Sequence, residues 1–236
     1  RRSDLCGGFF HATKEMKSKR EYIRRYVLLT FALFVNALGV AFITKATLGT
    51  SPISSLPYVL SIFTRFTLGE FTFIQNFIFI LIEVALMGWQ GFRNRYNEVL
   101  VQIPIVLFFS YSIDVCMTLL YDMLPTTYFS RVVDLGIGCV ILAIGIGWSV
   151  KANVAMNPGE YVVQLIAQRV NKEFGFVKLC FDCTLVLLAC AVSLLFMHSV
   201  NGIREGTIIA ALLVGPIVHF LYPCWRLFDK WLLAKA

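Results

Sequence analysis

Two lysines stand at matching places in the chain, each a short loop ahead of a predicted helix start. Lys45 comes before a Ser-Pro pair at residues 51–52, and Lys151 comes before an Asn-Pro pair at residues 157–158. Serine and asparagine are favoured N-cap residues and proline suits the first helical position, so each pair predicts the beginning of a helix. A helix start carries unpaired N–H groups and a positive partial charge, which attract anions. Two such starts brought together, with a lysine near each, predict a site for a small anion.

The predicted substrate-binding residues lie in these two loops and at the helix starts that follow them. They are Lys45, Thr47, Ser51, Lys151, Asn153, Asn157 and Glu160. Glu160 weakens the symmetry of the two copies, and it suits a coupling cation or the amino group of a zwitterion. The alternative for the two lysines is that each reaches its own membrane surface from the end of a span.

Polar side chains inside apolar segments form a second group of candidates. Ionisable groups are costly inside a membrane, so they are functional candidates by default. The candidates for coupling or intramembrane polar roles are Glu83, Asp114, Asp182, His219 and Asn76. For each of them the alternative is a structural hydrogen bond between two helices, and this alternative is favoured for His219 because it lies near the end of its span.

No motif of an enzyme or of a bound cofactor is found in the sequence. A Walker A loop, an HExxH zinc motif and a dinucleotide-binding fingerprint are absent from it. Cys180 and Cys183 form a CxxC pair on a predicted helix, which could hold a metal or act as a redox pair. We interpret these thiols as small packing residues. The sequence therefore predicts a protein with no catalytic residues, no cofactor and no metal.

The composition is that of a membrane protein. Hydrophobic residues make up 58% of the chain and charged residues 15%, and the mean hydropathy is +0.75. Soluble domains average about 45–50% apolar and about 25% charged residues. The net charge of +7 gathers in the N-terminal segment and the loops, which argues against nucleic acid as a partner. We predict an all-α polytopic membrane protein that has the lipid bilayer as its surroundings.

Six transmembrane helices are predicted, with two short half-helices between them. The spans are Tyr26–Thr44, Glu70–Gln90, Glu98–Leu120, Val132–Val150, Phe176–Met197 and Gly206–Tyr222, and the half-helices are residues 51–65 and 157–173. Residues 1–20 are expected to form a flexible tail. With the N-terminus inside, 17 Lys and Arg residues fall on the cytoplasmic side and 4 on the outer side. We therefore expect both termini in the cytoplasm. Whether the half-helices re-enter the membrane or lie at its surface stays open.

The chain contains an internal repeat. The stretch GVAFITKATLGTSPISSLPYVLS, which begins at Gly39, aligns without a gap with GIGWSVKANVAMNPGEYVVQLIAQ, which begins at Gly145, at an offset of 106 residues. We assign residues 21–125 to the first repeat and residues 126–236 to the second. Each copy holds three spans and one half-helix. Because three is odd, the second copy enters the bilayer from the opposite side, which predicts two inverted-topology repeats.

Three segments carry a resemblance to a known family. They are GVAFITKATLGTSPISSLPYVLS, LGEFTFIQNFIF and REGTIIAALLVGPIVHFL. They resemble the YczE/YyaS/YitT family of bacterial integral membrane proteins, and the likeness covers about residues 26–225. The resemblance implies a six-span protein of the bacterial cytoplasmic (inner) membrane. That family has no generally established biochemical activity, so the resemblance adds little about a substrate.

These features together predict a secondary transporter of a small anionic or zwitterionic solute. It would work by alternating access between the two repeats. One alternative is an accessory membrane protein that supports a biosynthetic or envelope complex without transporting anything. Another alternative is a flippase that acts on a lipid phosphate. The sequence leaves the coupling ion open, and it also leaves open whether the chain forms a homodimer.

Overall fold

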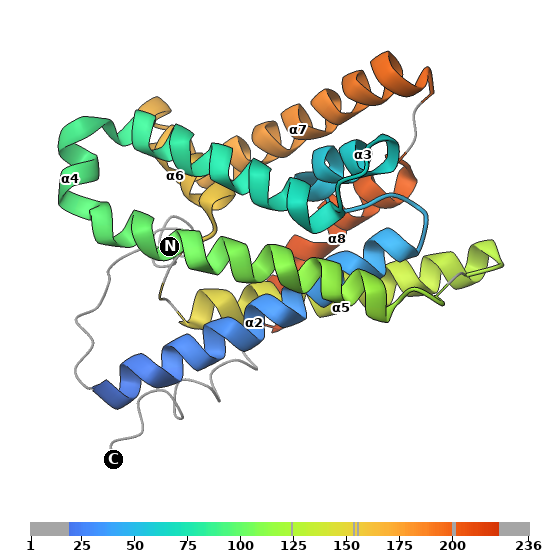
Figure 1. The fold of residues 1–236 in the computed structure, drawn as a ribbon, viewed down its shortest axis with the longest axis horizontal. Coiled ribbons are helices and arrows are strands. Elements are labelled where there is room, and N and C mark those ends of the chain that lie inside the picture. The colour runs from blue at the N-terminus through green and yellow to red at the C-terminus, as the bar shows by residue number, and fades with distance from the viewer. Residues whose placement is uncertain (1–18, 124, 153, 155, 200–201, 222–236) are drawn as a thin grey trace.

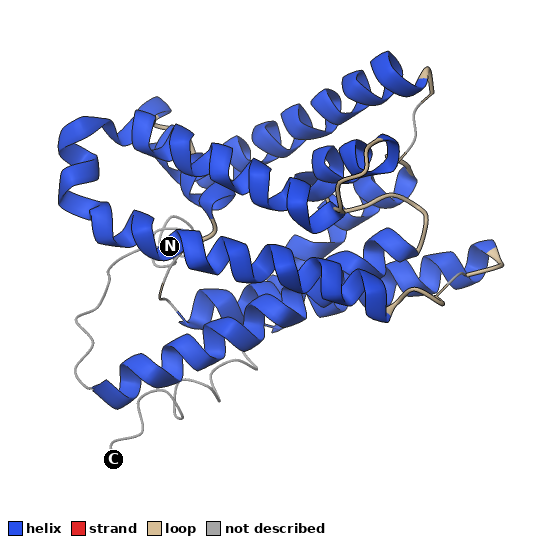
Figure 2. Ribbon diagram, in the orientation of Figure 1, coloured by secondary structure: helices blue, strands red, loops and turns tan. Residues whose placement is uncertain are grey.

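The computed structural model describes residues 19–221 except residues 124, 153, 155, 200 and 201. Every regular element in this part of the chain is a helix, and loops join the helices (Figure 2). In chain order the elements are α2 (Lys19–Lys45), η1 (Pro52–Ser54), α3 (Ser55–Phe63), α4 (Leu68–Leu119), α5 (Tyr128–Ala152), α6 (Pro158–Val170), α7 (Phe174–Met197) and α8 (Glu205–Leu221). The predicted all-α fold is confirmed for the described residues.

Four of the described helices are long and apolar enough to cross a membrane. They are α2, α4, α5 and α7. The predicted second and third spans both lie in α4, which has 52 residues. The predicted sixth span lies in α8, which has 17 residues and is shorter than the other four. The structure thus shows four candidate spans, and the count of six stays a prediction.

The long helix α4 bends sharply near its middle. Gly88 has a φ of 69° and a ψ of 170°, and Arg95 also leaves the helical region with a φ of −124°. Figure 1 shows that α4 doubles back on itself at this bend. We call residues 68–87 the first arm of α4 and residues 96–119 the second arm. The predicted boundary between two spans therefore exists as a bend rather than as a loop.

The helices α2 and α5 pack against each other in antiparallel directions. A Cβ atom built on Gly39 would lie 2.5 Å from the backbone nitrogen of Leu142, and one on Gly145 would lie 2.6 Å from the backbone nitrogen of Asn36. Further along, Gly138 faces Ile43 in the same way. Residue numbers rise on one helix as they fall on the other. The glycines let the two backbones come this close because they carry no side chain.

The two predicted half-helices are present as short helices. The first consists of η1 and α3, and the second is α6. Each begins with a proline at its first or second position, after an extended residue at the N-cap position. The cap residues Ser51 and Asn157 make no side-chain cap bond, so they start the helices by backbone conformation alone. Both helices are too short to cross a bilayer of about 30 Å, since a helix rises about 1.5 Å per residue.

The helix contacts follow the same pattern in the two halves of the chain. In the first half α3 packs against α7, and in the second half α6 packs against α4. Likewise α2 packs against α4, and α5 packs against α8. The short helices therefore lie between elements of both halves, and each touches a long helix of the other half.

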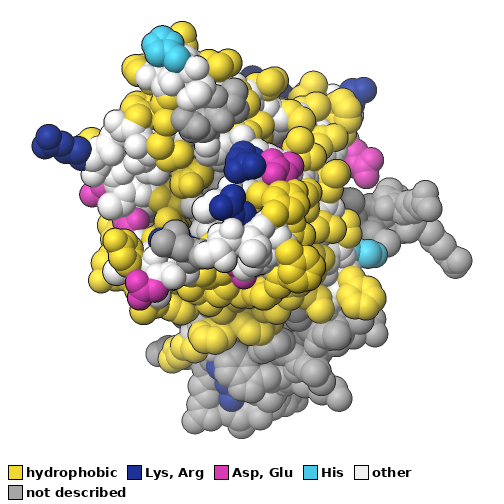
Figure 3. Space-filling model, turned by 90° about the vertical axis from the view of Figure 1, so that its right-hand side faces the viewer, with side chains coloured by type: hydrophobic (Ala, Val, Ile, Leu, Met, Phe, Trp, Pro, Cys, Tyr) yellow, Lys and Arg dark blue, Asp and Glu magenta, His cyan; other side chains and the backbone are white. Residues whose placement is uncertain are grey.

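Large apolar side chains cover much of the outer surface. Figure 3 shows one face on which hydrophobic side chains predominate and charged ones are few. In α7 only 17% of the most apolar stretch is buried, and side chains such as Leu187 and Leu195 are 68% and 73% exposed. Apolar patches of this extent are unusual on soluble proteins. This outward apolar surface is the one that a membrane location requires.

Candidate functional site

The two short helices meet at their starts. Ile53, in η1, and Gly159, in the first turn of α6, are in contact. A Cβ built on Gly159 would lie 2.9 Å from Cδ1 of Ile53 and 3.2 Å from the ring of Phe79. Pro52 and Pro158 are both buried beside this contact. The two predicted helix starts therefore lie in contact with each other.

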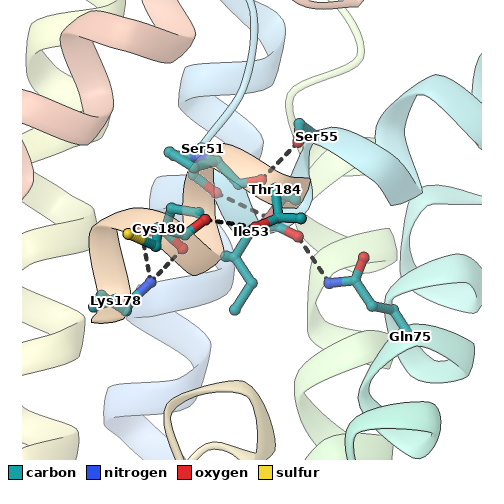
Figure 4. Close-up of polar contacts among 10 residues, drawn as sticks. Ser51, Ile53, Ser55, Gln75, Lys178, Cys180 and Thr184 are labelled. Carbon is teal, nitrogen blue, oxygen red and sulfur yellow. Dashed lines mark hydrogen bonds and ion pairs between the residues drawn. The ribbon is translucent and has the colours of Figure 1, made fainter. Parts of the chain in front are cut away.

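A buried amide holds the first helix start in place. Nε2 of Gln75, on the first arm of α4, donates to the carbonyl oxygen of Ile53 at 2.8 Å, as Figure 4 shows. Gln75 is 8% exposed, and its Oε1 atom is buried without a hydrogen-bond partner. A buried acceptor without a donor costs free energy unless water or a ligand satisfies it. Gln75 therefore offers an open acceptor next to the contact of the two short helices.

Serine hydroxyls line the same turn of the chain. Oγ of Ser51 donates to Oγ of Ser54 at 2.9 Å, and Oγ of Ser55 donates to the carbonyl oxygen of Pro52 at 2.6 Å. All three serines are buried. The hydroxyls thus bond within the turn, and the predicted binding residue Ser51 lies inside the site.

Charged residues approach this site from α6 and α7. Nζ of Lys178 donates to Oδ2 of Asp182 at 2.7 Å, and α7, which carries both, packs against η1 (Figure 4). Glu160 follows Gly159 directly on α6 and is half-buried. Burial raises the pKa of the Glu160 carboxyl, Lys178 lowers it, and Asp182 raises it again. One positive and two negative groups therefore lie together near the helix starts.

The predicted lysine pair is not brought together. Lys45 ends α2 and Lys151 lies in the last turn of α5, and these two helices run in opposite directions. Because Ile43 faces Gly138, the two lysines lie about 20 Å apart along the helix pair. Nζ of Lys45 lies 5.5 Å from the centre of the Tyr121 ring. Their part in substrate binding stays a prediction, and they do not share one site.

Of the other predicted binding residues, Asn157 lies beside the contact of the helix starts and Thr47 lies elsewhere. Asn157 occupies the N-cap position of α6 and is half-buried. Thr47 is exposed in a left-handed conformation, with a φ of 59°. Its carbonyl oxygen accepts from Arg204 at 3.5 Å. Asn153 lies outside the described residues.

The predicted intramembrane polar residues have separate surroundings. Asn76 is buried and donates to the carbonyl oxygen of Thr72 one turn earlier, at 2.8 Å. Asp182 pairs with Lys178 as described above. His219 is exposed on α8. Asn76 on α4 and Asp182 on α7, which are equivalent by the 106-residue offset, lie on helices that pack against the short helices.

Asp114 joins the two ends of α4. Its Oδ1 accepts from the backbone N–H of Gly69 at 2.8 Å, and its Oδ2 accepts from Oγ1 of Thr67 at 2.7 Å. Thr67 also forms a capping box with Glu70 at the start of the first arm. Asp114 therefore ties the end of the second arm to the start of the first.

Glu83 lies between the two arms of α4. It is 1% exposed, and its Oε1 accepts from Nε2 of Gln102 at 3.2 Å. Gln102 is 3% exposed and belongs to the second arm. Glu83 and Gln102 lie nearer to the bend of α4 than Gln75 does.

The loop after α2 packs onto the start of α8. The N–H of Gly206 donates to the carbonyl oxygen of Leu48 at 2.8 Å, and the N–H of Thr50 donates to Oγ1 of Thr207 at 3.2 Å. Gly49 has a φ of 120°, which favours glycine. Two of the segments that carry the family resemblance thus contact each other.

Two residues of the site, Lys178 and Gln75, are not among those that the sequence predicts. In the sequence Lys178 is one of the 17 Lys and Arg residues on the predicted cytoplasmic side. Its spacing of four residues from Asp182 was an available signal, because such pairs face each other on a helix. Gln75 directly precedes Asn76 and had no signal beyond its amide in an apolar run.

No group of three or more His, Cys, Asp or Glu side chains that could hold a metal occurs among the described residues. Cys180 and Cys183 are exposed free thiols on α7. Exposed thiols on an apolar outer face do not form a closed metal site.

The apolar helices, with polar groups buried at their contacts, define an α-helical membrane protein. Residues 23–223 match a family described as "Family of unknown function (DUF6198)", and the chain belongs to this family. It is 24% identical over 211 residues to "Uncharacterized membrane protein YczE" of Bacillus subtilis, covering 87% of this chain and 88% of that protein. This similarity confirms the resemblance to the YczE family.

A second relative comes from another bacterium. The chain is 24% identical over 193 residues to an "Uncharacterized protein" of Haemophilus influenzae, and the match covers 82% of this chain and 81% of the relative. No solved structure matches the chain. The comparisons therefore give family membership and similarity to a membrane protein.

Proposed function

We propose that the chain is a secondary transporter of a small zwitterionic solute, such as an amino acid, and that it works by alternating access between two inverted repeats. The observation that carries the proposal is the contact of Ile53 with Gly159. These residues are equivalent by the offset of 106, and charged and open polar groups gather beside them. Inverted-repeat transporters place their substrate site at such an interface, where short helix starts meet.

The packing of α2 on α5 supports the inverted repeat. Gly39 contacts Leu142, and Gly145 contacts Asn36. The offset of 106 turns the first pair into the second, with the partners exchanged. Reciprocal contacts of this kind arise about a two-fold axis. With α2 and α5 antiparallel, the axis would lie across the helices and therefore in the membrane plane.

Six spans would follow from the same helices. The two arms of α4 would each cross the membrane, and α8 would form the last span. Both termini would then lie in the cytoplasm of a bacterial cell, as the Lys and Arg distribution favours. The protein would thus be an inner-membrane protein. That it lacks catalytic activity stays a prediction from the absence of enzyme motifs in the sequence.

The charges beside the helix starts suit a zwitterion better than a simple anion. Lys178 and the N–H groups at the start of α6 would bind the carboxylate, because both carry positive charge. Glu160 and the open Oε1 atom of Gln75 would accept hydrogen bonds from the ammonium group. Asp182 would position Lys178 through their ion pair. A plain anion would leave the carboxyl of Glu160 without a partner, whereas Asp182 is already paired with Lys178.

Alternating access would occur by rocking one half of the chain against the other. The contact of Ile53 with Gly159 would lie near the axis of this motion, where displacements are smallest. The site would therefore keep its geometry while its exposure changed from one side of the membrane to the other.

The test is transport by purified protein in liposomes. A panel of radiolabelled amino acids and small organic anions is offered, and uptake into protein-containing liposomes is compared with uptake into empty ones. We expect uptake of a zwitterion, reduced about tenfold or more in Lys178→Ala and Glu160→Gln, which corresponds to a loss of about 1.4 kcal/mol or more.

Matched controls use exposed residues of the same charges. Lys172→Ala and Glu173→Gln alter exposed side chains near α7, and they should leave uptake unchanged. The pair Lys45→Ala with Lys151→Ala tests whether the distant lysines take part. The proposal is wrong if no panel member is moved and none raises the melting temperature. Movement of a labelled phospholipid would favour the flippase, and a stoichiometric copurifying protein would favour the accessory role.

A further inference from the structure

Glu83 and Gln102 form a buried pair in which two oxygen atoms lack a hydrogen bond. Nε2 of Gln102 donates to Oε1 of Glu83 at 3.2 Å. The other oxygen of each group, Oε2 of Glu83 and Oε1 of Gln102, is buried without a partner. The two residues are 1% and 3% exposed and come from opposite arms of α4. Each arm thus contributes one open acceptor to the same contact.

One proton would satisfy both open oxygens. An ionised Glu83 only accepts hydrogen bonds, and so does the carbonyl of Gln102. When Oε2 carries a proton, it becomes a donor, and the open amide oxygen of Gln102 in the same contact can accept from it. The pair then holds two hydrogen bonds, with the amide N–H given to the acid and the acid O–H given to the amide.

The surroundings oppose a charge at Glu83. Ile80, Val99 and Val106 form an apolar cluster around the contact of the two arms. An unpaired carboxylate among such side chains is costly, so the neutral acid is favoured. Glu83 forms no ion pair with any of the described residues, which further favours the proton-bound form.

The titratable groups that face Glu83 come from α4 and α6. Glu98, on the second arm, is exposed and adds negative charge. Glu83 also acts electrostatically on Tyr161 of α6. Arg95 is occupied with Tyr161, to whose hydroxyl oxygen its Nη1 donates at 2.6 Å. Arg95 therefore bonds to Tyr161 rather than to Glu83.

A metal cation suits this pair poorly. Hard cations take about six or more oxygen ligands, whereas Glu83 and Gln102 present two open oxygens. The apolar cluster of Ile80, Val99 and Val106 beside them adds no oxygen ligand. A proton needs only the two atoms that are present.

Two further open polar atoms lie on the arms of α4 on the side of the candidate site. Gln75 lies two turns before Glu83 on the first arm, and Ser110 lies two turns after Gln102 on the second. Oε1 of Gln75 and Oγ of Ser110 are also buried without partners. Because the arms are antiparallel, these two residues lie toward the same end, about 12 Å from the Glu83 level. Buried polar atoms of this kind are ordinarily satisfied by water, which conducts protons.

We infer that Glu83, held by Gln102, is a reversible proton-binding site that couples solute movement to a proton gradient. The proton site stands on the geometry of the pair alone. Its use in coupling rests on the proposed function. Gln75 relates the proton site to the candidate site. It lies on the same arm as Glu83, and its Nε2 donates to the carbonyl oxygen of Ile53 in the candidate site.

The proton site is tested by infrared spectroscopy of the purified protein in lipid, with the proton as the only ligand. Spectra recorded in acidic, neutral and alkaline buffer are subtracted from one another. We expect the carbonyl band of a protonated carboxylic acid at neutral pH, lost reversibly in alkaline buffer and missing from Glu83→Gln. Glu98→Gln, which alters an exposed carboxyl of the same helix, should keep the band.

A second variant, Gln102→Leu, tests the proton site even if Glu83→Gln does not fold. Gln102→Leu keeps the acid but removes the donor to its carbonyl oxygen, so the band should remain and move to higher frequency. An unchanged band in both variants, or its absence from the wild type at neutral pH, overturns the proton site. So does a band that disappears on adding sodium at constant pH, because that result indicates a sodium site.

Coupling is tested separately, with whichever panel solute the liposome assay finds to be moved. An inward proton gradient should raise wild-type uptake several-fold. Glu83→Gln should lose this stimulation and yet still exchange labelled for unlabelled solute across the membrane. If wild-type uptake does not change with the proton gradient, the coupling proposal is wrong and the transporter proposal is unaffected. If the Glu83 acid band is present but no solute is transported, the proposed function and the coupling are both wrong. The proton site is then still supported.

Discussion

Ile53 and Gly159 occupy equivalent positions in the two halves of the chain, and they touch each other. A Cβ on Gly159 would lie 2.9 Å from Cδ1 of Ile53. Equivalent residues meet in this way only at an axis that relates the halves, so the contact marks where such an axis would pass. The isoleucine fills the space that a side chain on the other copy would need. The starts of the two short helices can approach closely because one copy is glycine.

This contact predicts a specific pattern of damage and rescue. Gly159→Leu should lower the free energy of unfolding by about 1–3 kcal/mol, because the new side chain overpacks the contact with Ile53 and Phe79. Ile53→Ala removes the obstructing side chain, so the double variant should regain part of the loss. The measurement is the melting temperature in detergent of the wild type, both single variants and the double variant. Losses that simply add would contradict direct contact.

The crossing of α2 and α5 predicts equal sensitivity at two glycines. Gly39→Ala and Gly145→Ala each place a methyl group within 3 Å of the backbone of the facing helix. That backbone cannot move as a flexible side chain does, so each variant should be less stable by similar amounts, about 1–3 kcal/mol. Gly136→Ala is the matched control, because a Cβ there meets nothing within 4 Å. Strongly unequal melting temperatures for the two variants would speak against reciprocal packing.

The sequence predicted the elements better than the partners of the charged residues. Helix starts after Ser51 and Asn157 follow from local backbone preferences, which a sequence carries directly. The sequence left open whether Lys45 and Lys151 meet or lie at separate surfaces, because their separation depends on the antiparallel crossing of α2 and α5 rather than on spacing along the chain. The role of Asp114 depends in the same way on the folding back of α4, which brings it to Gly69. Such long-range pairings have no local sequence signal.

The bend of α4 predicts that Gly88 cannot be replaced without cost. Its φ of 69° and ψ of 170° lie in a region that only glycine enters readily. Gly88→Ala should therefore cost about 1–3 kcal/mol, although a Cβ at this position would meet nothing within 4 Å. The cost would come from backbone strain alone. The melting temperature of Gly88→Ala is compared with that of Gly136→Ala, and equal values would contradict the bend.

The packing of the first loop on α8 predicts a specific role for one hydroxyl. Oγ1 of Thr207 accepts from the buried N–H of Thr50. Thr207→Val keeps the shape and removes the acceptor, so it should cost about 1–3 kcal/mol. Thr207→Ser retains the oxygen and should cost less. Thermal melting of the two variants separates loss of the bond from loss of volume, and equal melting temperatures would count against the bond.

Asp114 is predicted to act in folding rather than in transport. Its carboxylate accepts from the N–H of Gly69 and the hydroxyl of Thr67, so Asp114→Ala leaves two donors without their acceptor. Hydrogen bonds to charged groups contribute about 1.5–3 kcal/mol, and the variant should lose stability of that order. Asp114→Asn keeps one acceptor oxygen and should lose less.

Two measurements separate a folding role of Asp114 from a coupling role. Melting temperature in detergent should fall in the order wild type, Asp114→Asn, Asp114→Ala. Uptake per folded molecule, and its stimulation by a proton gradient, should be the same in all three. Asp114 joins the two ends of α4 and lies about 18 Å along the second arm from Gln102, so it does not contact the Glu83 pair. If Asp114→Asn or Asp114→Ala has the melting temperature of the wild type but loses gradient-driven uptake, Asp114 acts in coupling rather than in folding.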